Sequence, residues 1–223
     1  MKLKLVIGNK NYSSWSMRPW VLLRQAQIPF EEVQLQFGDK DGGLHVVGIE
    51  KYSKASKVPV LLVDGQPVWD TLAIAETAAE LFPEKQLWPA EARARQVARS
   101  ACAEMHSGFG NLRDKMPMNI KGSHPGKGLT PEVQRDIDRL VALWSECRQA
   151  FGGGGSLLFG KFSVADAFFA PVVMRFRTYA VEVPRLAQDY CAAVEALPAV
   201  REWIEAARQE KKFVAADEPY TKK

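Results

Sequence analysis

Short apolar runs in the first part of the chain predict alternating strands and a helix. An unbroken apolar run from Leu3 to Ile7 predicts a buried strand, and a stripe of apolar positions over 20–26 predicts a helix. Apolar and polar residues alternate over 33–37, which is typical of a half-buried strand. A strand, a helix and a strand within so little chain favour a parallel strand pair with a right-handed crossover.

A hairpin and a second helix complete this first region. Residues 38–56 are polar and contain glycine, and we expect a loop there with room for one short helix. The Asp-Gly pair at 64–65 lies between two apolar runs and predicts a hairpin with a type I′ turn. A helix is expected to begin at 70–71 and to end at Pro83. Residues 1–83 therefore predict one domain with the order β-α-β, loop, β-β-α.

Beyond Pro83 the strand pattern ends and helical spacing takes over. We expect a linker at 84–89 and an all-helical domain over 90–223, beginning with one long helix at 90–116. Thr130-Pro131 is typical of a helix start, and Ser163 with Asp166 resembles a capping box. Pro198 is expected to open the last helix, and the polar tail after Phe213 is expected to wrap or fray. The glycines at 152–155 predict a connector, because no Gly-Lys-Ser/Thr motif follows them.

Composition narrows the classes of function. The chain has 223 residues with 47% hydrophobic and 25% charged residues, as in ordinary globular proteins. A short N-terminal apolar run and the lack of a stretch of about 20 apolar residues predict a cytoplasmic protein without a membrane segment. The 3 cysteines are far apart and the 3 histidines do not cluster, which argues against disulfides and a zinc site. A net charge of +4 without a basic run argues against nucleic-acid binding.

Small hydroxyl residues occupy the junction between the first strand and the first helix. Ser13, Ser14 and Ser16 lie where the backbone N–H groups of a helix N-terminus have no intrahelical partner. Those groups and the positive end of the helix dipole favour an anion, including a thiolate. The alternative is that one of these serines is only a helix N-cap. A second stretch, 57–71, favours a binding site.

Together these motifs resemble the cytosolic glutathione transferase family, as a bacterial member of the serine type. The serine segment, with Arg18 five residues after the first serine, is similar to that of the zeta and tau classes. Val58-Pro59 resembles the turn before the third strand of the family. Residues 69–74 resemble its Glu/Gln-Ser-x-Ala-Ile segment, and 162–170 its central capping box. The resemblance implies an α/β thioredoxin-like N-terminal domain that binds glutathione and an all-α C-terminal domain that carries the electrophile pocket.

The resemblance implies that a serine hydroxyl donates a hydrogen bond to the glutathione thiolate. Ser13 is the first candidate, and Ser14 and Ser16 are the alternatives. Tyr12 is a further candidate, with a packed aromatic side chain as the alternative interpretation. Lowering a thiol pKa by one unit takes about 1.4 kcal/mol, which a charge-assisted hydrogen bond and a helix N-terminus can supply. Ser13 and Ser16 stand where redox members have a C-x-x-C pair, which argues against a glutathione-dependent reductase.

The remaining glutathione contacts are also implied by the resemblance. Pro59 is expected to follow a cis bond, so that the backbone of Val58 pairs with the cysteinyl residue of glutathione. Thr71 would bind the γ-glutamyl carboxylate at a helix N-terminus. Asp70, in place of the family's Glu or Gln, would bind the ammonium, and an ordinary N-cap is compatible with that role. The glycyl carboxylate has two candidate partners in the preceding loop, Lys57 and Lys54, which can equally be solvated.

The electrophile pocket is expected on the long helix. Arg113 is the candidate that would hold an acidic second substrate. For Arg113 and for each apolar candidate, the alternative is a role in the core or in an interface. The apolar candidates are Met105, Phe109, Leu112 and Met116.

Three functions follow from the resemblance. The leading one is a detoxifying transferase that conjugates glutathione, as co-substrate, to a small electrophile without a metal. The second is maleylacetoacetate isomerase, because the zeta class has a Ser-Ser-x-Ser segment. Against it, Trp15 stands where that class has cysteine, and its substrate-binding arginine aligns near Thr178, with Arg175 and Arg177 only nearby. The third is a non-catalytic binding or scaffold protein. A homodimer is implied, with residues 60–105 near the two-fold axis.

Overall fold

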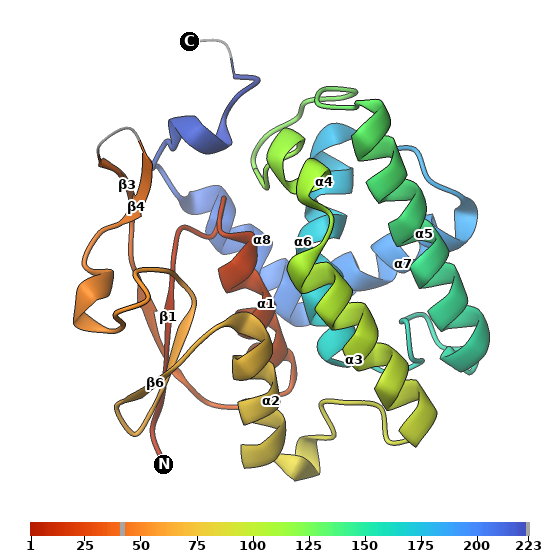
Figure 1. Ribbon diagram of the computed structural model, residues 1–223, viewed down its shortest axis with the longest axis horizontal. Coiled ribbons are helices and arrows are strands. Elements are labelled where there is room, and N and C mark those ends of the chain that lie inside the picture. The colour runs from red at the N-terminus through yellow and green to blue at the C-terminus, as the bar shows by residue number, and fades with distance from the viewer. Residues whose placement is uncertain (41–42, 222–223) are drawn as a thin grey trace.

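The computed structural model describes residues 1–40 and 43–221 (Figure 1). The N-terminal region contains a four-stranded sheet in the order β2-β1-β5-β6, with β1 parallel to β2 and antiparallel to β5. This is the predicted β-α-β, β-β-α arrangement. Its elements are β1 (Leu3–Ile7), α1 (Ser14–Gln25), β2 (Glu31–Gln34), β5 (Val60–Val63), β6 (Gln66–Val68) and α2 (Thr71–Leu81).

The hairpin between β5 and β6 has the turn that its sequence predicts. Asp64 has a φ of 47° and Gly65 a φ of 88°, and a type I′ turn requires positive φ at both central residues. The peptide bond between Val58 and Pro59 is cis, as expected from the resemblance. These two turns set the ends of β5 and bring residues 57–59 beside the end of β1.

A second hairpin lies in the segment predicted as a loop. β3 (Phe37–Lys40) and β4 (Gly43–Val46) pair in a separate two-stranded sheet, and the expected short helix follows as η1 (Ile49–Lys51). The strand predicted over 33–37 is present with other bounds, because β2 ends at Gln34 and Phe37 begins β3. The alternation of apolar and polar residues continues from β2 into β3. It therefore does not reveal that β2 pairs with β1 whereas β3 pairs with β4.

The C-terminal region is helical, with two departures from the sequence prediction. The long helix expected over 90–116 is broken at Gly108 and Phe109, where Phe109 has a φ of 56°. A helix over 185–196 was not predicted. The Ser163–Asp166 capping box is present, as expected. The helices are α3 (Ala92–Ser107), α4 (Gly110–Lys115), α5 (Pro131–Phe151), α6 (Val164–Tyr179), α7 (Arg185–Ala196) and α8 (Pro198–Gln209).

Helix α6 is the central element of the helical region. Nearly every one of its residues is buried, and it packs against α1, α3 and α7. Figure 1 shows α1 between the sheet and the helical bundle, so its N-terminus faces both parts of the molecule. The serine segment therefore lies where the two regions meet.

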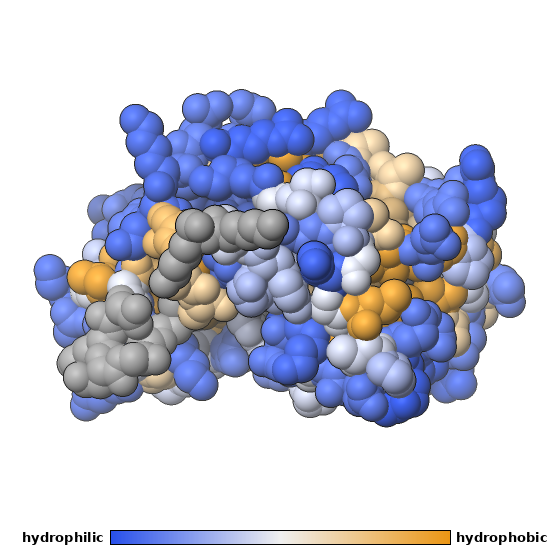
Figure 2. Space-filling view, turned by 90° about the horizontal axis from the view of Figure 1, so that it is seen from above, coloured by the Kyte–Doolittle hydropathy of each residue, from blue (hydrophilic) through white to orange (hydrophobic). Residues whose placement is uncertain are grey.

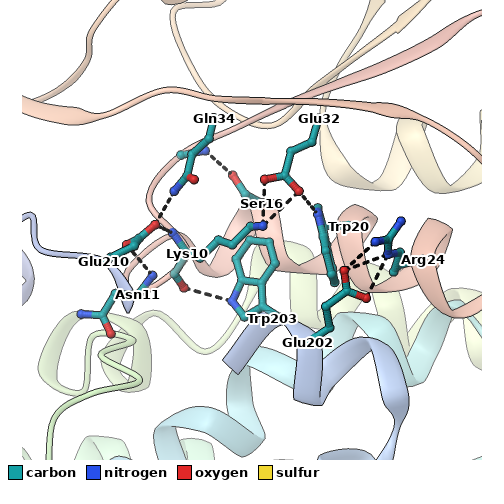
Figure 3. Close-up of polar contacts among 11 residues, drawn as sticks. Lys10, Asn11, Ser16, Trp20, Arg24, Glu32, Gln34, Glu202, Trp203 and Glu210 are labelled. Atoms are coloured by element: carbon teal, nitrogen blue, oxygen red, sulfur yellow. Dashed lines mark hydrogen bonds and ion pairs between the residues drawn. The ribbon is translucent and has the colours of Figure 1, made fainter. Parts of the chain in front are cut away.

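The end of α8 is tied to the loop that precedes the serine segment (Figure 3). The side chain of Glu210 accepts hydrogen bonds from the backbone N–H groups of Lys10 at 2.6 Å and Asn11 at 3.1 Å. Trp203 Nε1 donates to the Lys10 carbonyl at 3.0 Å, and Lys10 Nζ lies 2.8 Å from a carboxylate oxygen of Glu32. These contacts fix the backbone just before Ser13.

The face seen in Figure 2 is mostly hydrophilic, with its hydrophobic residues in scattered patches. Among the described residues, no helix is long and apolar enough to span a bilayer. No group of three or more His, Cys, Asp or Glu side chains suited to a metal ion is found over 1–40 and 43–221.

Replacing Glu210 by alanine tests this anchor. We expect Glu210→Ala to lower the free energy of unfolding by about 1–3 kcal/mol, because two N–H groups lose a charged acceptor. Urea unfolding measures the change, with Glu205→Ala, an exposed position on α8, as the matched control. Equal effects of the two substitutions would show that the anchor contributes nothing.

Candidate active site

A cavity of about 550 Å³ lies where the serine segment, the cis-proline turn, the start of α2 and helices α4 and α6 meet. Residues from distant parts of the sequence share its wall. Those predicted as site residues are Ser13, Ser14, Lys57, Val58, Pro59, Asp70 and Arg113. Further lining residues include Tyr12, Trp15, Trp69, Pro117, Met118, Arg175 and Asp217.

Ser13 is the N-cap of α1 and is linked to Ser16. Its Oγ accepts the Ser16 backbone N–H at 3.3 Å and donates to Ser16 Oγ at 2.7 Å. Ser16 is fully buried behind Ser13, and its Oγ also accepts the Gly8 N–H at 3.1 Å. A hydroxyl rotates to suit its partners. Rotation of both hydroxyls, so that Ser16 donates to Ser13, would leave the hydroxyl hydrogen of Ser13 free for a group in the cavity.

Ser14 has a different environment, set by an arginine of α6. Arg175 Nη2 donates to Ser14 Oγ at 3.2 Å. Other N–H groups of the same guanidinium donate to the carbonyl oxygens of Met116 at 2.9 Å and Pro171 at 3.3 Å. Burial lowers the pKa of Arg175 to about 10, so it stays charged at neutral pH. Because Ser14 Oγ accepts from a cation, its own hydrogen is left to donate elsewhere.

The indole ring of Trp15 lies close to two further arginines. The guanidinium carbon of Arg18 is 4.2 Å from the ring centroid and that of Arg113 is 5.5 Å away. Arg18 is only 1% exposed, and among the described residues its Nε and Nη1 have no hydrogen-bond partner. Burial lowers the pKa of Arg18 to about 9, and the positive charges of Arg175 and Arg113 lower it further.

Asp70 and Thr71 open α2 beside a histidine of α3. The Asp70 carboxylate accepts the Thr71 N–H, so the N-cap role of Asp70 is present. Thr71 is fully buried, and its hydroxyl lies 3.3 Å from Nδ1 of His106. His106 Nε2 is 3.8 Å from an oxygen of Asp70. Burial lowers the pKa of His106, while the charge of Asp70 opposes that shift.

The apolar candidates for the electrophile pocket lie in the hydrophobic core instead of the cavity wall. Met105 and Leu112 are fully buried, and Phe109 is 7% exposed within the same core. Met116 is likewise a core residue that contributes its carbonyl to Arg175. The break between α3 and α4 turns the chain, so helical spacing along 90–116 does not group these side chains. Arg113 alone of the five predicted residues is in the lining described here.

The C-terminal segment closes one side of the cavity. Tyr12 donates its hydroxyl to Glu218 at 2.8 Å, and Tyr220 donates to the Lys115 carbonyl at 2.8 Å. Asp217, directly before Glu218, lines the cavity, and its Oδ2 is buried without a hydrogen-bond partner in the described chain. Burial raises the pKa of Asp217 to about 6 against the opposing charge of Arg175.

Two family models match the sequence. The N-terminal domain of glutathione S-transferase matches residues 12–81, and the C-terminal domain matches residues 130–206. The chain belongs to the glutathione S-transferase family. These matches place it among glutathione transferase enzymes with a thioredoxin-like N-terminal fold, and enzymes of this family use glutathione and electrophilic substrates.

Individual relatives are more distant. A curated protein of Caenorhabditis elegans, named "Probable maleylacetoacetate isomerase", is 27% identical over 154 residues, covering 69% of this chain and 66% of the relative. The match thus spans just under two thirds of that relative. A glutathione transferase homologue from Burkholderia GL BGR1, solved with bound glutathione, has a TM-score of 0.71 at 22% identity, covering 94% and 100% of the two chains. A Tau class transferase from mango, Mangifera indica, has a TM-score of 0.66 at 16% identity, covering 93% and 96%.

Three residues of the candidate site were missed by sequence reasoning. Arg175 was considered only a neighbour of the position near Thr178, yet it lines the cavity and contacts Ser14. A charged residue directly after the apolar run at 167–174 was the signal that could have identified it. His106 and Asp217 reach the site through tertiary packing, and neither lies in a recognisable motif.

The raised pKa of Asp217 predicts a pH-dependent gain in stability on its removal. Ionised Asp217 destabilises the folded state, so Asp217→Asn should raise the unfolding free energy by about 1–2 kcal/mol at about pH 7.5. The gain should shrink as pH falls through the folded pKa of about 6 and vanish below the ordinary aspartate pKa of 3.8. Urea unfolding at several pH values measures it, with exposed Asp138→Asn as control. A gain that is independent of pH would contradict the prediction.

Proposed function

We propose that this protein conjugates the thiolate of glutathione to a small electrophile, with the thiolate stabilised by a serine hydroxyl at the N-terminus of α1. The observation that carries the proposal is the position of Ser13 and Ser14. Both lie in the cavity wall at a helix N-terminus, across from the cis-proline turn and Asp70. Hydroxyl and N–H donors there favour an anion.

Glutathione would occupy the cavity along the N-terminal domain. Val58, next to the cis bond, would pair its backbone with the cysteinyl residue, and Lys57 would meet the glycyl carboxylate. The γ-glutamyl end would lie at the start of α2, with its ammonium on Asp70 and its carboxylate near Thr71. His106 already contacts the Thr71 hydroxyl, so it would orient this end of the site.

The serine would act by making ionisation of the thiol easier. In the structure Ser13 donates to Ser16. Rotation of both hydroxyls would let Ser16 donate to Ser13 and leave the Ser13 hydrogen for the sulfur. Ser14, polarised by Arg175, is the alternative donor. A shift of one to two pKa units corresponds to about 1.4–2.7 kcal/mol, within the range of one charge-assisted hydrogen bond and a helix N-terminus.

The dependence of conjugation on pH tests this proposal. For Ser13→Ala we expect the acidic limb of the pH profile of kcat/KM for the electrophile, measured with saturating glutathione, to move up by about one pH unit. At low pH this corresponds to about a tenfold loss of kcat/KM. The affinity for glutathione should change little, since the other contacts remain. Ser14→Ala tests the alternative donor, and Ser100→Ala, an exposed serine on α3, is the matched control.

The outcomes separate the hypotheses. A shift confined to Ser14→Ala would transfer the role to Ser14, and a shift in neither variant would remove the serine mechanism. A wild-type protein that binds glutathione without conjugating any electrophile would favour the non-catalytic binding protein. The remaining proposals are a cytoplasmic location, a homodimer and a role in detoxification.

A second candidate is glutathione-dependent maleylacetoacetate isomerase. The observation in its favour is Arg175, which would provide a cation for an acidic substrate beside Ser14. The curated Caenorhabditis elegans relative carries that name. Trp15, in place of the cysteine of the resembling class, stands against it.

An isomerase assay with maleylacetoacetate tests this candidate. We expect measurable glutathione-dependent conversion, at least tenfold weaker in Arg175→Gln with a raised KM. Circular dichroism should accompany the assay, because Arg175 also holds the Met116 carbonyl. Wild-type protein that conjugates other electrophiles and leaves maleylacetoacetate unchanged would exclude the isomerase.

A further inference from the structure

A second pocket lies between the loop that joins α4 to α5 and the C-terminal ends of α6 and α8. Its volume is about 430 Å³, which is within the range of small-molecule sites. None of its lining residues belongs to the lining of the candidate active-site cavity. The lining residues are Ile120, Lys121, Gly122, Ser123, Arg177 and Arg208.

Three positively charged side chains converge on this pocket from three segments. Lys121 belongs to the α4–α5 loop, Arg177 to the last turn of α6 and Arg208 to the last turn of α8. A cation in the last turn of a helix stabilises the negative end of the helix dipole, which accounts for each arginine by itself. The dipoles do not account for the meeting of both arginines and a lysine in one pocket.

The positive charges of the pocket are not balanced by carboxylates. Glu195 lies 4.0 Å from Arg177 Nη1. Over residues 1–40 and 43–221, no other acidic side chain lies within 4.0 Å of the charged nitrogens of Lys121, Arg177 or Arg208. Burial lowers the pKa of Arg177, and the positive charge of Arg208 lowers it further against the effect of Glu195. Three cations against one carboxylate leave a surplus of two positive charges.

The hydrogen-bond donors of these cations are only partly used by the protein. Arg177 Nη2 donates to the Ile120 carbonyl at 2.8 Å, and Lys121 Nζ donates to the Glu210 carbonyl at 2.7 Å. A guanidinium has five N–H donors and an ammonium group has three, so both side chains keep donors for a ligand. The Ser123 hydroxyl in the same lining can also donate.

The loop that carries Lys121 is held in place by hydrogen bonds. The Lys121 N–H donates to the side-chain oxygen of Asn11 at 2.9 Å, and the Ile120 N–H donates to the Asn11 carbonyl at 3.2 Å. The side-chain oxygen of Asn119 accepts from the Asn11 side chain at 2.9 Å and from the Gly122 N–H at 3.1 Å. A preorganised site loses less entropy on binding than a mobile one. The pocket is therefore built to receive a ligand without a rearrangement of this loop.

We propose that this pocket binds a phosphate group, either as free phosphate or as the phosphate monoester of a small molecule. A phosphate monoester carries a charge of about −1.5 to −2 at neutral pH, which matches the surplus of positive charge. The guanidinium groups of Arg177 and Arg208 suit phosphate oxygens, and Lys121 adds a point charge. This inference does not depend on the proposed conjugation reaction.

Calorimetry with two probes tests the site. Inorganic phosphate and glycerol 3-phosphate are titrated into the wild type at an ionic strength held at about 0.15 M with sodium chloride, so that screening is the same throughout. We expect one molecule bound per chain with a dissociation constant of about 1 mM or lower. Tighter binding of glycerol 3-phosphate would identify a phosphate ester as the ligand, and equal or weaker binding would identify free phosphate.

Variants of Arg208 assign the binding to this pocket. Arg208→Gln should weaken it at least fivefold, and Arg208→Lys should keep most of the affinity because the charge remains. Arg208 is exposed at the end of α8, so circular dichroism should show an unchanged helix content in both variants. Arg201→Gln, at an exposed position of the same helix, is the matched control. It changes the net charge by the same amount and should leave the affinity unchanged.

Three results would overturn the proposal. The first is that neither probe binds at about 20 mM, well above the expected dissociation constant. The second is equal weakening by Arg208→Gln and Arg201→Gln, which would show only a general effect of net charge. The third is binding that Arg113→Gln abolishes and Arg208→Gln leaves unchanged, which would place the anion in the candidate active-site cavity.

Discussion

The contact between Arg175 and Ser14 joins the two halves of the molecule at the point where the chemistry is proposed. Arg175 comes from α6, the most buried helix, and Ser14 from the first residue of α1. The same guanidinium holds the Met116 carbonyl at the end of α4. A single buried cation therefore fixes the position of the serine segment relative to the wall that would face the electrophile.

A second set of contacts holds the serine segment from the other side. Glu210 accepts hydrogen bonds from two backbone N–H groups just before Ser13. The Tyr12 hydroxyl donates a hydrogen bond to Glu218 of the C-terminal segment. The segment that completes the cavity thus also orients the loop that carries the proposed thiolate donor. Rigid support of this kind matters, because a hydrogen bond to a thiolate weakens steeply when its geometry is lost.

Local motifs made the fold largely predictable from the sequence. The Asp64-Gly65 turn, the Thr130 cap and the Ser163–Asp166 capping box each depend on residues within a few positions of one another, and all three are present. The β3–β4 hairpin and the break at Phe109 depend on tertiary packing, so the pattern of apolar positions did not reveal them. The predicted boundaries of the two domains stay predictions.

The residues of the candidate site divide in the same way, into those of local motifs and those brought together by tertiary packing. Ser13, Pro59 and Asp70 belong to contiguous motifs and were found from the sequence. Met105 and Phe109 have the right helical spacing for a pocket, yet spacing does not tell a cavity from a core. Arg175, His106 and Asp217 come together only through the packing of three separate segments.

The ionisation of bound glutathione is the property on which the account depends most directly. Glutathione labelled with ¹³C at the cysteinyl Cβ, titrated by NMR in the saturated wild-type complex, reports the thiol pKa without any assumption about the electrophile. The account predicts a bound thiol pKa about one to two units below that of free glutathione. A bound pKa equal to or above the free value would contradict thiolate stabilisation at the N-terminus of α1.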